Sequence, residues 1–150
     1  MSNKCAAWVG VTMIAVGLLA NTPSEARAKR PRVNCREEIW PKDPKIHELV
    51  REDMRDGKPR SGLKPPAKTT HVLPEYPKEA VKQGLVGRLV VMGRIDSRTG
   101  QPTDLTVDGG PEMLAAAALK AARKWRYRPL EIDGVKYDLE LHAEITFTLE

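Results

Sequence analysis

The stretch VKYDLELHAEITFTLE, Val135 to Glu150, decides the fold of this chain. Every second residue in it is apolar or aromatic, and the residues between them are polar or charged. The apolar set is Val135, Tyr137, Leu139, Leu141, Ala143, Ile145, Phe147 and Leu149. Because strand side chains point alternately to opposite faces, this pattern predicts one long β-strand with a buried face and a wet face. A helical period of 3.6 residues would scatter the same positions around a cylinder.

A sheet that is wet on one face is typical of antiparallel pairing, with helices over the other face. Upstream, residues 87–95 alternate in the same way, with Leu89, Val91 and Ile95 facing inward. Residues 96–100 have turn chemistry, and Leu105 and Val107 give the returning strand its inward pair. The sequence therefore predicts a β-hairpin beside the terminal strand.

Two helices are predicted around this hairpin. The first opens at Tyr76-Pro77 and ends at Gly84, and the second begins after Gly109-Gly110-Pro111. The buried stripe of the second helix is predicted to comprise Leu114, Ala118, Ala121, Ala122 and Trp125. The order helix, strand, strand, helix, strand indicates an α+β domain. Its predicted core includes Leu114, Trp125, Leu141, Ile145 and Phe147.

Length and composition favour one domain with appendages, since the chain has 150 residues and 41% of them are hydrophobic. The formal net charge of +5 favours acidic surfaces but does not choose among nucleic acid, lipid and protein. A basic cluster follows the second predicted helix: Lys120, Arg123, Lys124, Arg126 and Arg128. We interpret it as complementing the helix dipole, with an anionic partner as the alternative. Nucleic-acid binding is not expected, because proteins that bind nucleic acid usually pair such charge with exposed aromatic residues or a recognition helix, and Tyr127 alone does not provide these.

Residues 1–28 follow the plan of a secretory signal peptide, with a basic start, an apolar run over 5–20 and the small-residue site Ala26-Arg27-Ala28. The apolar run is shorter than the roughly 20 residues that span a bilayer. Export to the periplasm is therefore predicted. The alternative is a short inner-membrane anchor that faces the periplasm.

Residues 29–70 are charged and rich in proline, and we interpret them as a linker that contains one short helix. Asp43 can cap this helix, Pro44 suits its first position, and Gly57 can end it. One helical face would hold Ile46, Leu49, Val50 and Met54. Cys35 would be the only cysteine after cleavage, and we interpret it as a tolerated surface thiol; pairing with another chain is the alternative.

The sequence offers no set of residues for catalysis or metal binding. After cleavage, the histidines are His47, His71 and His142. A zinc motif starting at His47 fails, because a second histidine is needed four positions later and Arg51 is found there. His142 lies between Glu140 and Glu144 on the polar face of the predicted strand, where a solvated side chain is expected. We predict no enzyme activity, no cofactor and no metal.

Several short motifs occur in a characteristic order over residues 73–150. They are Tyr76-Pro77-Lys78-Glu79-Ala80, Gly84 with Gly87, Ile95-Asp96 with Gly100, residues 121–129, and Ile145-Thr146-Phe147. In this order and spacing, the chain resembles the C-terminal domain of the TonB energy-transducer family.

The resemblance implies a two-layer α+β fold over residues 71–150, with two helices on one face of a three-stranded antiparallel sheet. It also implies a periplasmic domain that binds the TonB box of an outer-membrane transporter by β-strand addition, in support of energised uptake of the siderophore type. The partner-binding residues carried over are Leu73, Pro74, Tyr76, Pro77, Ala143, Glu144, Ile145, Thr146, Phe147, Thr148 and Leu149. The long terminal strand is expected to leave an unpaired edge for the added strand.

Two departures from the family pattern leave two functions open. Leu73 stands where family members usually have glutamine, and the N-terminal apolar run has no histidine. One function is a transducer that couples a transporter to an ExbB/ExbD-type motor, which requires an anchor. The other is a soluble periplasmic peptide-binding or scaffold module without direct coupling to the motor. Strand-swapped homodimers are a further expectation.

Overall fold

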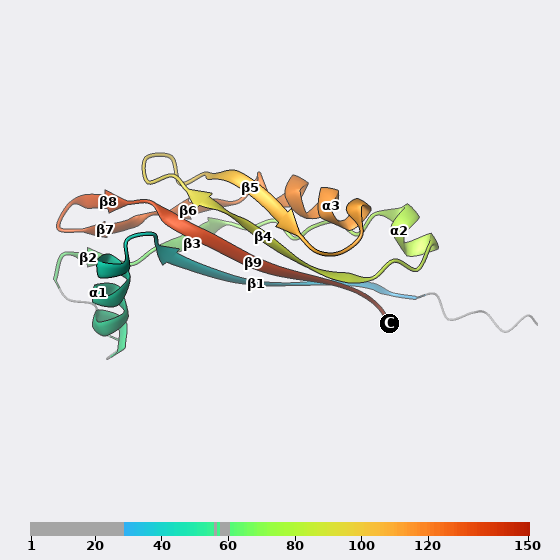
Figure 1. Ribbon diagram of the computed structural model, residues 1–150, viewed down its shortest axis with the longest axis horizontal. Helices are drawn as coiled ribbons and strands as arrows, with labels where there is room; N and C mark the ends of the chain where they lie inside the picture. The colour runs from blue at the N-terminus through green and yellow to red at the C-terminus, as the bar shows by residue number, and fades with distance from the viewer. Residues whose placement is uncertain (1–28, 56, 58–60) are drawn as a thin grey trace, which may run out of the picture.

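The computed structural model describes residues 29–55, 57 and 61–150. The predicted signal peptide, 1–28, lies outside the described residues. A four-stranded antiparallel sheet forms the centre of the molecule, in the order β1 (Pro31–Pro41), β9 (Leu139–Leu149), β4 (Gly87–Ile95), β5 (Pro102–Asp108). Figure 1 shows β1 running alongside β9 over the length of the sheet.

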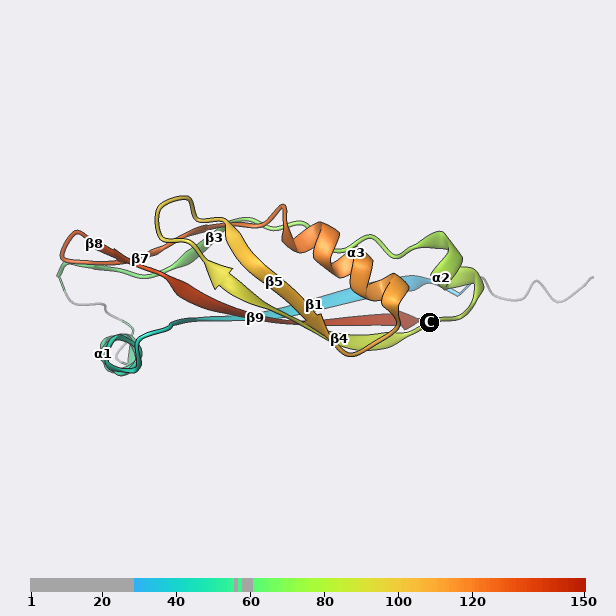
Figure 2. The ribbon, with the colours of Figure 1, turned by 45° about the horizontal axis from the view of Figure 1, so that its top comes forward.

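Helices α2 (Lys78–Lys82) and α3 (Glu112–Ala122) lie over one face of this sheet (Figure 2). Helix α1 (Pro44–Arg55) lies at one end, next to β1. Two small sheets complete the fold: β2 (Leu63–Lys64), β7 (Leu130–Ile132) and β8 (Val135–Tyr137) form one, and β3 (Ala67–Thr70) and β6 (Arg126–Arg128) form the other. The α+β class and the antiparallel sheet are confirmed. The main sheet has four strands, however, and not three.

The core lies between the main sheet and α3. The inward residues of β9, from Leu139 to Phe147, are fully buried, and so are Leu89, Val91 and Ile95 of β4. Leu114 and Trp125 are also fully buried. All five core residues predicted from the sequence are therefore confirmed. Alternation is a reliable signal here because a shift of one residue would bury the charged set.

The single strand predicted over 135–150 is interrupted at Asp138. Its carboxylate accepts a hydrogen bond from the backbone N–H of Ser97 at 2.8 Å. Residues before this break form β8, which turns back on β7 at Asp133–Gly134, both with positive φ. Val135 is 54% exposed as a result, so its predicted inward position is wrong.

The linker expected over 29–70 is largely integrated into the fold. Strand β1 pairs with β9 along its whole length, from Pro31 opposite Leu149 to Pro41 opposite Leu139. Strands β2 and β3 pair with β7 and β6. The interpretation of this region as a spacer is wrong, because its backbone groups are satisfied by strands of the domain.

Helix α1 is present where the sequence predicts a short helix. The Asp43 carboxylate accepts the backbone N–H of Lys45 at 2.8 Å, which satisfies one of the open donors at the helix start. Of the apolar face predicted for this helix, Val50 is buried, whereas Met54 is 46% exposed. The helix contacts the domain through one end of the sheet and leaves its last turn in water. No helix among the described residues is long and apolar enough to cross a membrane.

Candidate partner-binding edge of the sheet

Strand β9 is paired on both sides. Ile145, for example, lies opposite Leu89 of β4 and opposite Cys35 of β1. The expectation of an unpaired edge on the terminal strand is therefore wrong, since β1 covers that edge from Leu139 to Leu149. The two outer strands of the main sheet are β1 and β5.

The predicted partner-binding residues of β9 divide between the two faces of the sheet. Ala143, Ile145 and Phe147 are fully buried in the core, and Leu149 is partly buried against it. The polar face contains Glu144, Thr146 and Thr148. Glu144 forms an ion pair with Arg88 on β4. A partner that pairs with β9 would thus contact its backbone and the side chains of the polar face.

The segment around Tyr76 contains the other predicted binding residues. Tyr76 is nearly buried, its hydroxyl donates to the carbonyl of Leu85, and its ring meets Phe147 edge-on at 5.1 Å. Pro74 is buried, and Pro77 immediately precedes α2. Leu73 is 54% exposed and lines a hollow of about 360 Å³ beside α3. Among these residues Leu73 is the one most open to a partner, whereas Tyr76 belongs to the core.

Sequence reasoning missed a cluster of polar groups on the inward face of β1. Its centre is Glu37, whose side chain is only 7% exposed. Its Oε2 atom lies 2.9 Å from Lys68 Nζ and accepts a hydrogen bond from the Tyr127 hydroxyl at 3.1 Å. Its Oε1 atom lies 2.7 Å from His71 Nε2 and 3.7 Å from Cys35 Sγ. We call these five residues, Cys35, Glu37, Lys68, His71 and Tyr127, the Glu37 cluster.

Burial and charge disfavour loss of the proton from two groups of the Glu37 cluster, the Cys35 thiol and the Tyr127 hydroxyl. Burial first, and then the negative charge of Glu37, raise the pKa of Cys35 to about 12, although Lys68 partly opposes this shift. Burial and Glu37 also raise the pKa of Tyr127. Cys35 is thus not the surface thiol expected from the sequence but a half-buried one, protonated near neutral pH.

His71 lies between Glu37 and the core residue Trp125. Its ring stacks on Trp125, with centroids 5.1 Å apart and an interplanar angle of 29°. The indole N–H of Trp125 donates to the carbonyl of Val72 at 2.8 Å, which fixes the backbone next to His71. The contact links β1 to the segment that leads to Leu73.

The sequence contains a weak signal for β1 that could have revealed this arrangement. Val33, Cys35 and Ile39 alternate with polar residues, as in a half-buried strand. Two residues obscure the pattern: Glu37 occupies an inward position, and Trp40 an outward one. A carboxylate at an inward position is tolerated here only because Lys68, His71 and Tyr127 surround it.

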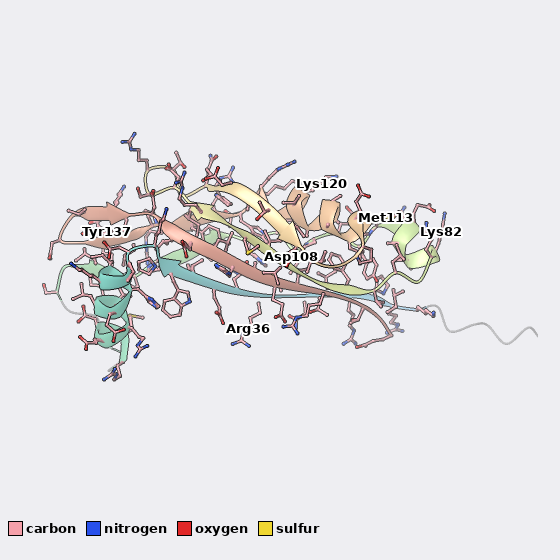
Figure 3. The ribbon with its side chains drawn as sticks, in the orientation of Figure 1. Arg36, Lys82, Asp108, Met113, Lys120 and Tyr137 are labelled. Atoms are coloured by element: carbon pink, nitrogen blue, oxygen red, sulfur yellow. The ribbon has the colours of Figure 1, made fainter. Side chains whose placement is uncertain are left out.

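The basic cluster at the C-terminal end of α3 is exposed except for Arg126, which is partly buried. Lys120 lies on α3 near the edge of the molecule in Figure 3. The Arg126 guanidinium donates to the carbonyls of Arg123 and Trp125, which fits the interpretation that these cations complement the helix end. Tyr127 is only 4% exposed and is not available to stack on a base.

Comparison with known proteins identifies the family of the chain. Residues 72–149 match the family described as Gram-negative bacterial TonB protein C-terminal. The chain belongs to this family. The matched region runs from the residue after His71 almost to the end of the chain, and it includes β9 but not β1.

The chain is similar to two further proteins. The chain is 33% identical over 88 residues to "Protein TonB" of Vibrio cholerae, a match that covers 58% of this chain and 36% of that protein. The chain thus spans about a third of the length of this relative. A solution structure of the TonB C-terminal domain from Pseudomonas aeruginosa is 27% identical, with a TM-score of 0.45, and the match covers 59% of this chain and 87% of the other.

Proposed function

We propose that this protein binds the TonB box of an outer-membrane transporter by strand addition along β9, in the place that β1 occupies, and so supports energised uptake. The role is one of binding and force transmission, not of catalysis. The observation that carries the proposal is the eleven-residue antiparallel register between β1 and β9. The edge of β9 is able to accept an extended backbone there, and membership of the TonB C-terminal family supports a transporter segment as the guest.

Strand β1 has the properties of a replaceable strand. It pairs with β9 alone in the main sheet, and its downstream connection to α1 is the short turn Lys42–Asp43. Its inward residues Val33, Cys35 and Ile39 are only partly buried, whereas the residues of β9 opposite them are fully buried. An incoming peptide would restore the same main-chain hydrogen bonds, so the net change in free energy depends mainly on side chains.

The pairing predicts which guest peptides bind. Positions opposite Phe147, Ile145 and Leu141 face the core and favour small or branched apolar residues. The position opposite Ala143 faces Lys68, His71 and Tyr127, so an acidic or polar residue is favoured there. The other face of the guest strand would lie beside Glu144 and Thr146, in water.

A reversible lock on β1 tests the proposal. Asn34 and Thr146 lie opposite each other on the polar face, so the pair Asn34→Cys and Thr146→Cys can form a disulfide between β1 and β9. In a background with Cys5→Ser and Cys35→Ser, TonB-box peptide should bind the reduced protein. Oxidation should abolish binding, and reduction should restore it.

The matched control is a lock at the other side of the sheet. The pair Met92→Cys and Thr106→Cys joins β4 to β5, which leaves β1 mobile relative to β9. Binding there should be the same in oxidised and reduced protein. Equal peptide binding with β1 locked would reject replacement of β1, and absence of binding to the wild-type chain at millimolar peptide would reject strand addition altogether.

The same edge supports a second function, a soluble periplasmic scaffold that self-associates. If β1 of one copy replaced β1 of another, a strand-swapped homodimer would form without any new type of contact. Light scattering on the locked and unlocked variants separates this case, because a swapped dimer requires the unlocked state. The N-terminal mass of protein from cells decides coupling to an ExbB/ExbD-type motor, since a start near Lys29 removes any anchor.

A further inference from the structure

The Glu37 cluster contains three atoms of the kinds that bind transition metals. They come from Cys35, Glu37 and His71, each of which offers one ligand atom, and these ligand atoms lie within 4.8 Å of one another. Two of the residues are on β1, and His71 directly follows β3 by one position. His71 is more than thirty residues from Cys35 and Glu37 in the sequence. The pairing of β1 with β9 and of β3 with β6 places these segments in the fold that brings the three residues together.

We propose that Cys35, Glu37 and His71 form a binding site for a divalent transition-metal ion of the zinc class. Thiolate, imidazole and carboxylate are the ligands that zinc uses in proteins, and three such ligands with one water complete a tetrahedron. The site does not rest on the proposed transport function, but a guest strand that replaced β1 would take Cys35 and Glu37 away from His71.

The distances suit this geometry. Metal–ligand bonds of about 2.0–2.3 Å at tetrahedral angles place ligand atoms roughly 3.3–3.8 Å apart. Cys35 Sγ lies 3.7 Å from Glu37 Oε1. His71 Nε2 lies 2.7 Å from the same oxygen, so an ion would have to separate these two by less than about 1 Å. A side-chain adjustment of this size needs no change of the backbone.

Neighbouring residues orient the ligands. Lys68 and Tyr127 hold Oε2 of Glu37, which leaves Oε1 directed at Cys35 and His71. Stacking on Trp125 holds the His71 ring. His71 Nε2 is shielded from solvent and, although close to Oε1, makes no well-directed hydrogen bond. Ligand orientation by surrounding hydrogen bonds of this kind is usual at metal sites.

The charges also balance. On binding, the S–H bond of Cys35 breaks, a sulfur–metal bond forms, and the proton passes to water. Thiolate and carboxylate then carry two negative charges against the dication, and neutral His71 adds none. Lys68 lies on the far oxygen of Glu37, so its charge lowers the affinity without blocking the ligand atoms.

Cobalt(II) is a suitable probe because it replaces zinc and absorbs visibly when a thiolate binds it. The reduced full-length chain should bind one cobalt ion, with a thiolate-to-cobalt charge-transfer band that zinc abolishes by competition. Cys35→Ser should remove the band, and His71→Asn should weaken binding at least about tenfold. The matched controls are Cys5→Ser, which removes the chain's other cysteine, and His142→Asn, an exposed histidine on β9. Both controls should bind as the wild type does.

Thermal unfolding identifies any variant that fails to fold. Zinc should raise the melting temperature of the wild type and of both controls, because an ion that binds only the folded state stabilises it. Cys35→Ser should melt cooperatively without zinc and should not respond to it. The proposal is overturned if the wild type binds no cobalt at millimolar concentration, if Cys5→Ser removes the band, or if Cys35→Ser responds to zinc as the wild type does.

Discussion

Strands β4 and β1 flank the same strand, β9, and both pair with it in antiparallel register. They differ in what their side chains do. Leu89, Val91 and Ile95 of β4 are fully buried, whereas Val33, Cys35 and Ile39 of β1 are only partly buried. The remaining inward position of β1, between Cys35 and Ile39, is occupied by Glu37, which is held by polar contacts.

Backbone pairing alone therefore does not set the free energy at which a strand opens. Main-chain hydrogen bonds contribute similarly on both sides of β9, since each replaces a bond to water. Apolar burial contributes about 25 cal/mol per Å² and is concentrated on the β4 side. We therefore expect β4 to open only with global unfolding and β1 to open separately, at lower free energy.

The largest effect is expected on the β4 side. Leu89→Ala should lower the free energy of unfolding by about 2–5 kcal/mol, because it empties a fully buried position. Urea denaturation should show a lower midpoint with an unchanged slope. The control is Val86→Ala, at a position that is 51% exposed, which should change stability by less than about 0.5 kcal/mol.

A smaller effect is expected on the β1 side. Ile39→Ala should lower the free energy of unfolding by roughly 1–2 kcal/mol, because water already reaches part of the side chain. Amide hydrogens that bond β1 to β9 should exchange faster than those that bond β4 to β9. If Ile39→Ala cost as much as Leu89→Ala, the two neighbours of β9 would be equivalent.

The stability of the β1 side should also depend on alkaline pH, through the thiol of Cys35. The folded chain holds the pKa of Cys35 at about 12, against an ordinary value of 9.0. Between these values the unfolded chain has lost the thiol proton and the folded chain retains it, so stability falls as the pH rises from 9 to 12. Below pH 9 this group contributes no pH dependence.

The effect is moderate, because the thiol is only half-buried. Cys35→Ser should reduce the slope of urea midpoint against pH over that range and leave it unchanged below pH 9. An identical slope in the variant would show that Cys35 is not protected by β1 pairing.

The smallest effect is expected at the end of β1. Arg32→Ala removes an ion pair with Glu150, in which Nε and Oε2 are 2.9 Å apart and both side chains are more than half exposed. The cost should be below about 0.5 kcal/mol and should shrink in salt. Arg88→Ala, which removes the pair with Glu144 on the β4 side, provides the matched measurement. A cost above about 1 kcal/mol for Arg32→Ala would mean that charge holds β1 in place.

Much of the core could be predicted from the sequence, because it depends on local pattern. Alternation over 139–147 identified the buried face of β9, and the spacing of Leu114 and Trp125 identified the buried stripe beside it. The same pattern failed at Val135, since a turn at Asp133–Gly134 sent β8 into a different sheet. It failed more seriously for β1, where Glu37 conceals the alternation.

That β9 receives a partner stays a prediction, and the expectation that its edge is free is wrong. The sequence indicates β9 as the strand for a partner, but the register that covers it with β1 joins residues 31–41 to residues 139–149. Such pairing is made by the N–H and C=O groups that every residue except proline carries, so it leaves little mark on side-chain composition. For the same reason, no motif predicted the meeting of Cys35, Glu37 and His71.

Local sequence specifies which face of each strand is buried and where the helices begin, because alternation, capping residues and glycines act over a few positions. Which backbone covers the edge of β9, and which polar side chains meet beneath it, follow only from the packing of the whole domain. Those outcomes depend on contacts between segments about a hundred residues apart, and their free energy comes from shared main-chain groups and from burial that neither segment achieves alone.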